Sequence, residues 1–248
     1  MKSILILNKR EGETPLAALL RLRAKSKKYE NIKMTYAGRL DPMASGVLLA
    51  LLGEEIKNKE KYLALDKEYE CEVLFGFATD TYDILGKITH SNTLTNIRIK
   101  DIIKNLKYFR GRFRQTYPLY SSKTVKGKQL WEYGRDEKAV ELPTREVTIK
   151  KLKFLGLKRA SGQKLLSDII KRIGKVDGDF RQKEILSVWR KKLAGKESAN
   201  FYIAGFAIRS SSGTYVRAIA HALGERLGIP ALAYRIKRTK VGKFAKIS

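Results

Sequence analysis

The spacing of apolar and polar side chains along the chain predicts a mixture of strands and helices. Alternating or β-rich positions predict four strands, at residues 3–7, 69–77, 145–157 and 201–209. Apolar side chains at helical spacing predict three helices, at residues 14–23, 95–109 and 216–227. Residues 31–41 suit a strand or an extended loop. This order of elements predicts an α+β fold, with a mixed and largely antiparallel central sheet flanked by helices and loops.

A basic segment over about residues 158–200 lies between two of the predicted strands. It contains two helical patterns, at 165–173 and 185–193, separated by the glycine-bounded stretch 174–178. We therefore expect a helical hairpin inserted into a single domain that spans 1–248. The apolar stripes of this hairpin favour packing against the main body. Its basic faces fit either a solvated surface or a contact with phosphate.

The charge of the chain favours one kind of partner. The 248 residues include 52 Lys and Arg against 25 Asp and Glu, a formal net charge of +27. Self-repulsion of this size opposes a compact state, so a polyanionic partner is a more natural explanation than a generally basic proteome or a high-salt habitat. RNA, DNA and an anionic membrane surface all meet this description.

Several other classes of protein find little support. The longest apolar run, 47–52, is far short of the ~20 residues that cross a bilayer, and 4–7 is too short for the core of a signal peptide. Cys71 is the only cysteine, and His90 and His221 are the only histidines, so a zinc site or a Ser-His-Asp triad has few residues available. We expect a cytoplasmic protein with no metal site, whose chemistry uses carboxylates, Tyr, Lys or Arg.

One carboxylate stands in an unusual turn. Asp41 lies between Leu40 and Pro42, and Gly38 and Gly46 frame the segment. Proline restricts the residue before it to extended or turn geometry, and glycine allows backbone to approach a ligand closely. By spacing alone, an ordinary surface turn explains this segment equally well.

Aromatic and basic side chains gather in two further blocks. Tyr69 begins a predicted strand and faces either the core or a cleft, and 79–83 has the composition of a polar turn. Residues 112–128 interleave Arg and Lys with aromatic residues in what we expect to be a loop. Such a loop suits RNA, with cations on phosphates and rings stacked on bases, although its rings also suit anchorage to the protein body.

The last block, residues 210–217, leads into a predicted helix. Gly213 gives the turn conformational freedom, and Thr214 is suited to cap the helix. Arg217 falls in the first helical turn, where the helix dipole disfavours a cation. We therefore predict that a carboxylate holds Arg217.

These blocks occur in the order found in TruB-type tRNA pseudouridine synthases, which the chain resembles from about Ser3 to Phe244 apart from the basic insertion. The segments that carry the resemblance are GRLDPMASGVL, KEY, FGFATDTYD, QTYPLYSSK, REVTI and SSGTYVRAIAHALGERLG. Each segment alone is modest evidence, and six in order are a strong signal. The resemblance implies the pseudouridine synthase fold and an enzyme that converts uridine-55 in the T loop of tRNA to pseudouridine without a cofactor.

The resemblance also implies roles for particular residues. Asp41 is implied to be the catalytic aspartate, which acts at C1′ or C2′ of the ribose, with Arg217 as its ion-pair partner. Tyr69 is implied to stack on the target base, which flips out of the RNA, and to help remove its C5 proton. Further substrate-binding positions are implied at Tyr36, Gly38, Arg39, Tyr120, Ser121, Lys123 and Ile236.

The chain departs from the family pattern at several points. Tyr36 stands where the family has a histidine that assists base flipping; a tyrosine still stacks but lacks the histidine's hydrogen bonds. Lys-Arg replaces Lys-Pro at 9–10, Tyr-Pro replaces Pro-Pro at 117–118, and Lys123 comes one position early. Many relatives continue beyond position 244 into a C-terminal RNA-binding domain of the PUA kind. We expect this chain to lack that domain, and we expect the basic insertion to replace part of the RNA binding that the domain supplies in relatives.

Three functions remain open at this point. The favoured one is a stand-alone, monomeric synthase that acts on the T arm of tRNA without an obligatory protein partner. A guide-dependent synthase shares the same blocks but relies on partner proteins and a guide RNA. A non-catalytic RNA-binding or chaperone protein on the same scaffold is the third, and the joint presence of Asp41, Tyr69 and Arg217 argues against it.

Overall fold

The computed structural model describes residues 3–92 and 96–245, and its centre is one large sheet. The strands of this sheet are β1 (Ile4–Lys9), β2 (Met34–Ala37), β3 (Ala44–Leu52), β4 (Lys67–Phe75), β7 (Gly111–Thr116), β10 (Thr144–Ser161), β11 (Asn200–Ser210), β12 (Ala231–Val241) and β13 (Phe244–Ala245). Their order is β1-β3-β12-β4-β11-β10-β7, with β2 paired to β3 and β13 to β12. Among the strands of this sheet in the described ranges, only β3 and β12 pair in parallel, so the predicted α+β fold with a largely antiparallel sheet is confirmed.

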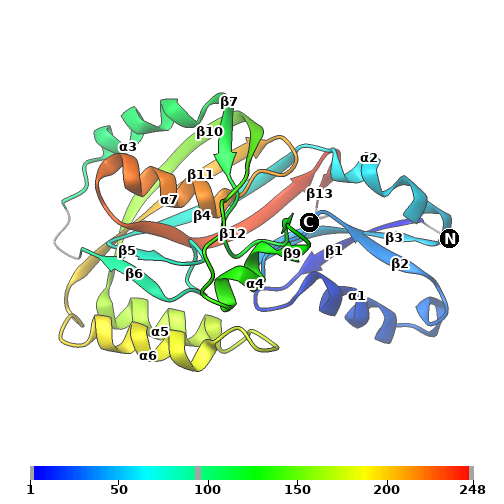
Figure 1. Cartoon of the computed structure of the whole chain (residues 1–248), viewed down its shortest axis with the longest axis horizontal. Coiled ribbons are helices and arrows are strands. Elements are labelled where there is room, and N and C mark those ends of the chain that lie inside the picture. Colours follow the sequence, from blue (N-terminus) through cyan, green and yellow to red (C-terminus); the bar gives the residue numbers. More distant parts are fainter. Residues whose placement is uncertain (1–2, 93–95, 246–248) are drawn as a thin grey trace.

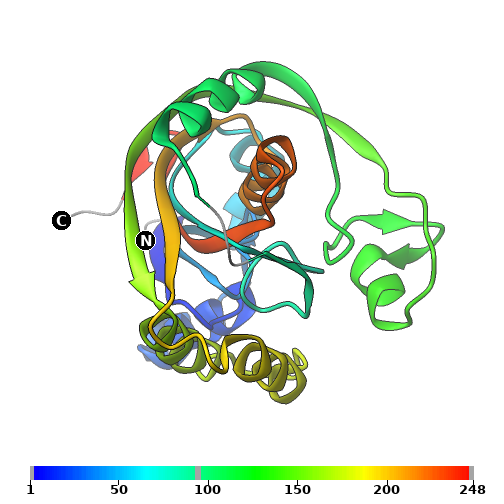
Figure 2. The ribbon, with the colours of Figure 1, turned by 90° about the vertical axis from the view of Figure 1, so that its left-hand side faces the viewer.

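Two helices fill the curved face of the central strands. Figure 2 shows the sheet bending around α7 (Val216–Leu227), with α3 (Ile99–Leu106) beside it. Phe75, Phe206 and Ile219 belong to the apolar core between these layers. The helix predicted over 95–109 begins at Ile99 and ends in a 3-10 turn at Phe109, and position 95 lies outside the described residues.

The N-terminal strands are covered on both faces. Alternate side chains of β3 point to opposite sides, as the period of a strand requires. Leu49 and Leu51 pack with α2 (Lys59–Leu63) through Tyr62, whereas Ala50 and Leu52 pack with α1 (Pro15–Ala24) through Leu19. This arrangement places the β2–β3 turn, which carries the Asp41 motif, at the boundary between the N-terminal strands and the central sheet (Figure 1).

The basic insertion is a helical hairpin of α5 (Gly162–Ile173) and α6 (Gln182–Leu193). The pairing of β10 with β11 continues to Ser161 and Asn200, so the hairpin begins at 162 and not at 158 as predicted. Its apolar stripes pack on the main body, which confirms that expectation. Trp189 is fully buried against Phe77, with ring centres 5.0 Å apart, and its indole N–H donates to the carbonyl of Ile84 at 3.3 Å.

Two small hairpins lie outside the large sheet. One consists of β5 (Phe77–Thr79) and β6 (Ile88–Ser91), and the other of β8 (Thr124–Val125) and β9 (Lys128–Gln129), followed by α4 (Leu130–Arg135). The prediction of a loop over 112–128 is wrong at both ends, because 112–116 belongs to β7, and 124–125 and 128 belong to the hairpin of β8 and β9. No helix in the ranges 3–92 and 96–245 is long and apolar enough to span a membrane.

Candidate active site

A cleft of about 890 Å³ opens where the β2–β3 turn, the start of α7 and the loop between α5 and α6 converge. All but one of the site residues predicted from the sequence line this cleft: Tyr36, Gly38, Arg39, Asp41, Tyr69, Tyr120, Ser121, Arg217 and Ile236. The exception is Lys123, which is exposed outside the cleft with its Nζ 5.8 Å from the ring centre of Tyr117. Residues from distant parts of the sequence therefore share one concave site, as binding sites commonly do.

An ion pair lies on the floor of the cleft. Arg217 donates from Nε to Oδ2 of Asp41 at 2.9 Å, which confirms the predicted carboxylate partner. Its other nitrogens donate to the carbonyls of Thr81 at 2.7 Å and Tyr120 at 2.8 Å. The Arg217 side chain is 3% exposed, whereas that of Asp41 is 37% exposed. The guanidinium is thus fixed by three acceptors, and the carboxylate it holds remains accessible to a ligand.

The charges around Arg217 favour its cationic form. Burial lowers the pKa of Arg217, but the carboxylates of Asp41 and Asp83 outweigh burial and raise the pKa above its usual range. Burial raises the pKa of Asp83 to about 6, against the opposing effect of Arg217. Residues 79–83 are therefore more than the polar turn predicted from their composition, because they supply a carbonyl and a buried carboxyl beside the ion pair.

A buried arginine that the sequence analysis did not identify, Arg238, fixes the Asp41 turn. Arg238 on β12 is 1% exposed and donates to the carbonyls of Gly38 at 3.0 Å, Arg39 at 3.1 Å and Val47 at 2.7 Å. Gly46 has a φ of +108°, and a Cβ there would lie 2.1 Å from the carbonyl oxygen of Arg238. Glycine is therefore required where β3 meets β12.

Lys9 supports the same turn from the other side. Its ammonium group is fully buried and donates to the carbonyls of Arg10 at 2.9 Å, Pro42 at 3.2 Å and Ala44 at 2.5 Å. Burial lowers the pKa of Lys9 to about 8, with the nearby carboxylate of Asp41 among the groups that oppose this shift. Lys9 thus fixes the carbonyls of Pro42 and Ala44, on either side of Met43.

A mostly apolar wall completes the cleft. Tyr69 on β4 is 9% exposed, and Ile236 on β12 is 7% exposed. Burial raises the pKa of Tyr69, and Arg238 opposes that rise, so the phenol is neutral at ordinary pH. Tyr36 on β2 lines the cleft as well. Neutral aromatic and aliphatic surfaces of this kind suit a planar ring.

The start of α7 is held by a residue that sequence analysis did not identify. Thr214 does not cap the helix; its hydroxyl donates to the carbonyl of Ser211 at 3.0 Å. Gln115 on β7 instead accepts from the N–H of Tyr215 at 2.8 Å and donates to its carbonyl at 3.1 Å. The alternation of exposed arginines with inward-facing residues along 112–115 was the signal for this strand.

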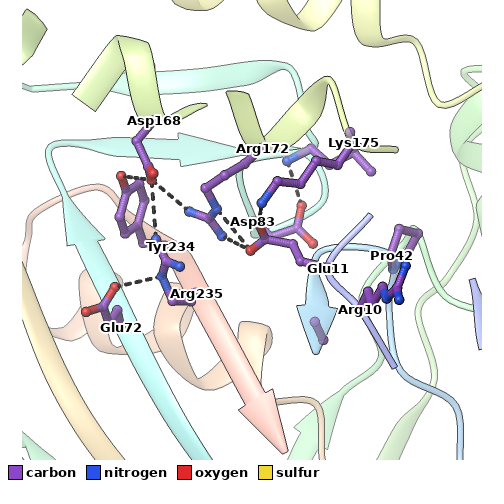
Figure 3. A network of polar contacts seen from close by, with 12 residues as sticks. Arg10, Glu11, Pro42, Glu72, Asp83, Asp168, Arg172, Lys175, Tyr234 and Arg235 are labelled. Atoms are coloured by element: carbon purple, nitrogen blue, oxygen red, sulfur yellow. Dashed lines mark hydrogen bonds and ion pairs between the residues drawn. The ribbon is translucent and has the colours of Figure 1, made fainter. Parts of the chain in front are cut away.

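A second polar network ties the N-terminal loop to the hairpin (Figure 3). Arg172 on α5 is 1% exposed and pairs with Glu11 at 2.7 Å and with Asp168 at 3.3 Å. Asp168 also accepts from the hydroxyl of Tyr234 on β12. The network therefore joins α5 to the sheet and to the loop that follows β1. Within the described ranges, no group of three or more His, Cys, Asp or Glu side chains is placed to hold a metal ion.

Comparison with known proteins agrees with this fold and site. Residues 25–170 match the model of the TruB family pseudouridylate synthase N-terminal domain. The tRNA pseudouridine synthase B of Endomicrobium trichonymphae is 31% identical over 242 residues, which cover 97% of this chain and 85% of the relative. The tRNA pseudouridine synthase B of Geobacillus thermodenitrificans is 34% identical over 249 residues, which cover 98% of this chain and 68% of the relative.

The solved structures that resemble the chain support the same architecture. A crystal structure of a Cbf5-Nop10-Gar1 complex contains a chain that matches with a TM-score of 0.61 at 19% identity. The match covers 98% of this chain and 50% of that chain, so the protein spans half the length of its structural relative. At this identity the likeness concerns the fold alone. Together with the family match, these observations define the class: the chain belongs to the TruB family of pseudouridine synthases.

Proposed function

We propose that the protein converts uridine-55 in the T loop of tRNA to pseudouridine, with Asp41 as its catalytic carboxylate. The observation that carries this proposal is the ion pair of Asp41 with Arg217 on the floor of the cleft. A carboxylate that acts on a ribose has to be ionised, and a fixed cation beside it favours that form. The names of the two bacterial relatives, both tRNA pseudouridine synthases, support tRNA as the substrate.

The proposed reaction replaces the bond between C1′ and N1 of the target nucleotide with a bond between C1′ and C5. Asp41 acts on the ribose, as nucleophile at C1′ or as base at C2′, and the bond between C1′ and N1 of the base breaks. The base turns and C5 bonds to C1′; in the nucleophile route the bond between Asp41 and C1′ breaks in this step, and in the base route Asp41 returns the proton to C2′. C5 then loses its proton, and N1 gains a proton. Tyr69 is suited to stack on the base during this turn. Its raised pKa makes it a poor base in the free protein, so proton removal from C5 by Tyr69 requires a lower pKa in the complex.

Access to the target uridine requires base flipping. Unstacking costs roughly a few kcal/mol, and groups that occupy the vacated space offset this cost. We assign that task to Tyr36, whose ring lines the cleft. The net charge of +27 supplies attraction for the phosphates. We further assign part of the binding of tRNA phosphates to exposed lysines of the α5–α6 hairpin, namely Lys164, Lys171, Lys183, Lys191 and Lys192.

We propose that the protein acts alone, as a cytoplasmic monomer without a guide RNA or an obligatory partner. The bacterial relatives are named as tRNA enzymes, whereas the likeness to the Cbf5 complex is one of fold. Asp41, Tyr69 and Arg217 together in one cleft favour an enzyme over a non-catalytic RNA-binding protein.

The test uses purified protein and two RNAs. A T-arm stem-loop and the full tRNA are incubated with the protein alone, and pseudouridine is mapped by chemical modification and primer extension. We expect modification at the T-loop uridine and no product when that uridine is replaced by cytidine. Absence of product on both RNAs would contradict the proposal.

A further inference from the structure

The loop between α5 and α6 reaches the cleft that contains Asp41. Asp179, Phe180 and Arg181 of this loop line the cleft. Arg181 precedes α6 with a φ of +62°, in the left-handed region that costs free energy for a residue with a Cβ. Such a conformation persists where surrounding contacts hold it.

The guanidinium of Arg181 joins two segments that lie far apart in the sequence. Its Nη1 donates to Oδ2 of Asp80 at 2.8 Å and lies 2.8 Å from the hydroxyl oxygen of Tyr120. The guanidinium carbon also lies 4.5 Å from the ring centre of Tyr120, within the range of a cation–π contact. The side chains of Arg181 and Asp80 are only 18% and 19% exposed.

These two partners belong to the segments that orient Arg217. Asp80 is the neighbour of Thr81, whose carbonyl accepts from Nη1 of Arg217, and the carbonyl of Tyr120 accepts from Nη2. Arg181 therefore joins the two supports of Arg217, and the remaining bond of Arg217 goes to Asp41. A displacement of either support would turn the guanidinium and move the carboxylate that it holds.

The hairpin is anchored well enough to act as such a support. Trp189 is fully buried in the core under the hairpin. At the start of the same loop, a Cβ on Gly12 would lie 2.3 Å from the carbonyl oxygen of Lys175, so these two backbones touch. Gly12 in turn donates its N–H to the carbonyl of Pro42 at 2.9 Å, and Glu11 pairs with the hairpin (Figure 3). One end of the loop thus contacts the segment that bonds to Pro42, and the other end contacts the two segments that bond to Arg217.

We propose that Arg181 is a positioning residue, through which the inserted hairpin holds Arg217, and with it Asp41, in the geometry the reaction needs. This inference rests on the proposed function of Asp41. Arg181 is largely buried and its contacts lie within the protein, which favours positioning over a contact with an RNA phosphate. A misplacement of about 1 Å costs on the order of 10²-fold in rate, so a support that does not touch the substrate still governs catalysis.

The test compares Arg181→Ala with wild type in single-turnover assays on the T-arm stem-loop. The control is Arg98→Ala, which removes an exposed arginine and its ion pair with Asp101 outside the cleft. We expect Arg181→Ala to lower the rate at saturating RNA by about 10-fold to 100-fold. Its RNA affinity is expected to stay within about twofold of the control, since no phosphate contact is lost. Arg181→Lys, which cannot reproduce the planar guanidinium, is expected to recover only part of the rate.

A double-mutant cycle identifies the route of the effect. Tyr120→Phe removes the hydroxyl that Arg181 contacts, so its effect on the saturating rate is expected to be smaller in the Arg181→Ala background than in wild type.

Equal saturating rates for Arg181→Ala and Arg98→Ala would overturn the inference. So would a loss confined to RNA affinity, in which the slope of log affinity against log salt concentration falls by about one. If Arg181→Ala does not fold, the Arg181→Lys variant decides, and a wild-type rate for it would overturn the inference. Absence of product from wild type would overturn the proposed function itself.

Discussion

Arg217 and Asp41 are 176 positions apart in the sequence, yet Nε of Arg217 donates to Oδ2 of Asp41 across 2.9 Å. The arginine belongs to the first turn of a helix, where the dipole disfavours its charge. Three hydrogen-bond acceptors, of which one is the carboxylate of Asp41, and the nearby carboxylate of Asp83 outweigh that disadvantage. The pair therefore links the start of α7 to the β2–β3 turn.

Removal of Arg217 is expected to reduce both stability and activity. Arg217→Met leaves the partly exposed Asp41 without its cation and the carbonyls of Thr81 and Tyr120 without this donor, and a buried acceptor left unpaired costs about 1 to 3 kcal/mol. Urea denaturation measures the loss, and the pseudouridine assay measures the activity. Arg226→Met, an exposed position on the same helix, is expected to cost less than about 1 kcal/mol. Equal stability of the two variants would contradict this account of the pair.

The junction of β3 with β12 is expected to reject any side chain at Gly46. In Gly46→Ala the new Cβ would lie 2.1 Å from a backbone oxygen of Arg238. We expect a loss of more than about 2 kcal/mol of unfolding free energy, from the clash and the strained backbone together. The matched control is Gly156→Ala, which also has a positive φ, at +147°, but finds no atom within 4 Å of the added Cβ. A similar loss in both variants would show that backbone conformation alone matters.

Asp83 is expected to make stability depend on pH. Its pKa in the folded protein is about 6, above its ordinary 3.8, because burial disfavours the carboxylate. The folded state therefore binds more protons than the unfolded state between about pH 4 and pH 6, and stability falls as pH rises through this window. A shift of about 2 pH units corresponds to about 3 kcal/mol. Urea denaturation of wild type and Asp83→Asn should give a difference that changes across this window and is constant above it; a constant difference throughout would refute the assignment.

Local patterns were sufficient to predict much of the fold. The β-rich run at 69–77 and the helical spacing at 216–227 describe β4 and α7 to within two residues at each end. That a carboxylate holds Arg217 was predicted as well, because an unfavourable cation in a first helical turn is a local signal; the family resemblance implied that this carboxylate is Asp41. The strand at 111–116 was missed, because its exposed arginines and aromatic neighbours resemble an RNA-binding loop as closely as an edge strand.

Other parts of the site leave no local trace in the sequence. Arg181 meets Tyr120, 61 positions away, and Asp80, 101 positions away, so no window of sequence contains the contact. Arg238 stands among Arg235, Lys237 and Lys240 in the sequence, and its burial follows from the pairing of β12 with β3. Tertiary structure alone brings Arg181 to the segments that hold Arg217, and Arg238 to the Asp41 turn.

The most direct test of the account is the conversion of Asp41 to Asn, which keeps the size of the side chain and an acceptor for Arg217 but removes the charge. Wild type and Asp41→Asn are compared at saturating T-arm RNA in single-turnover reactions, with RNA affinity measured in parallel. We predict pseudouridine at the T-loop uridine with wild type, and no detectable product with Asp41→Asn at a similar RNA affinity. Product formed by Asp41→Asn at the wild-type rate would contradict the assignment of Asp41 as the catalytic carboxylate.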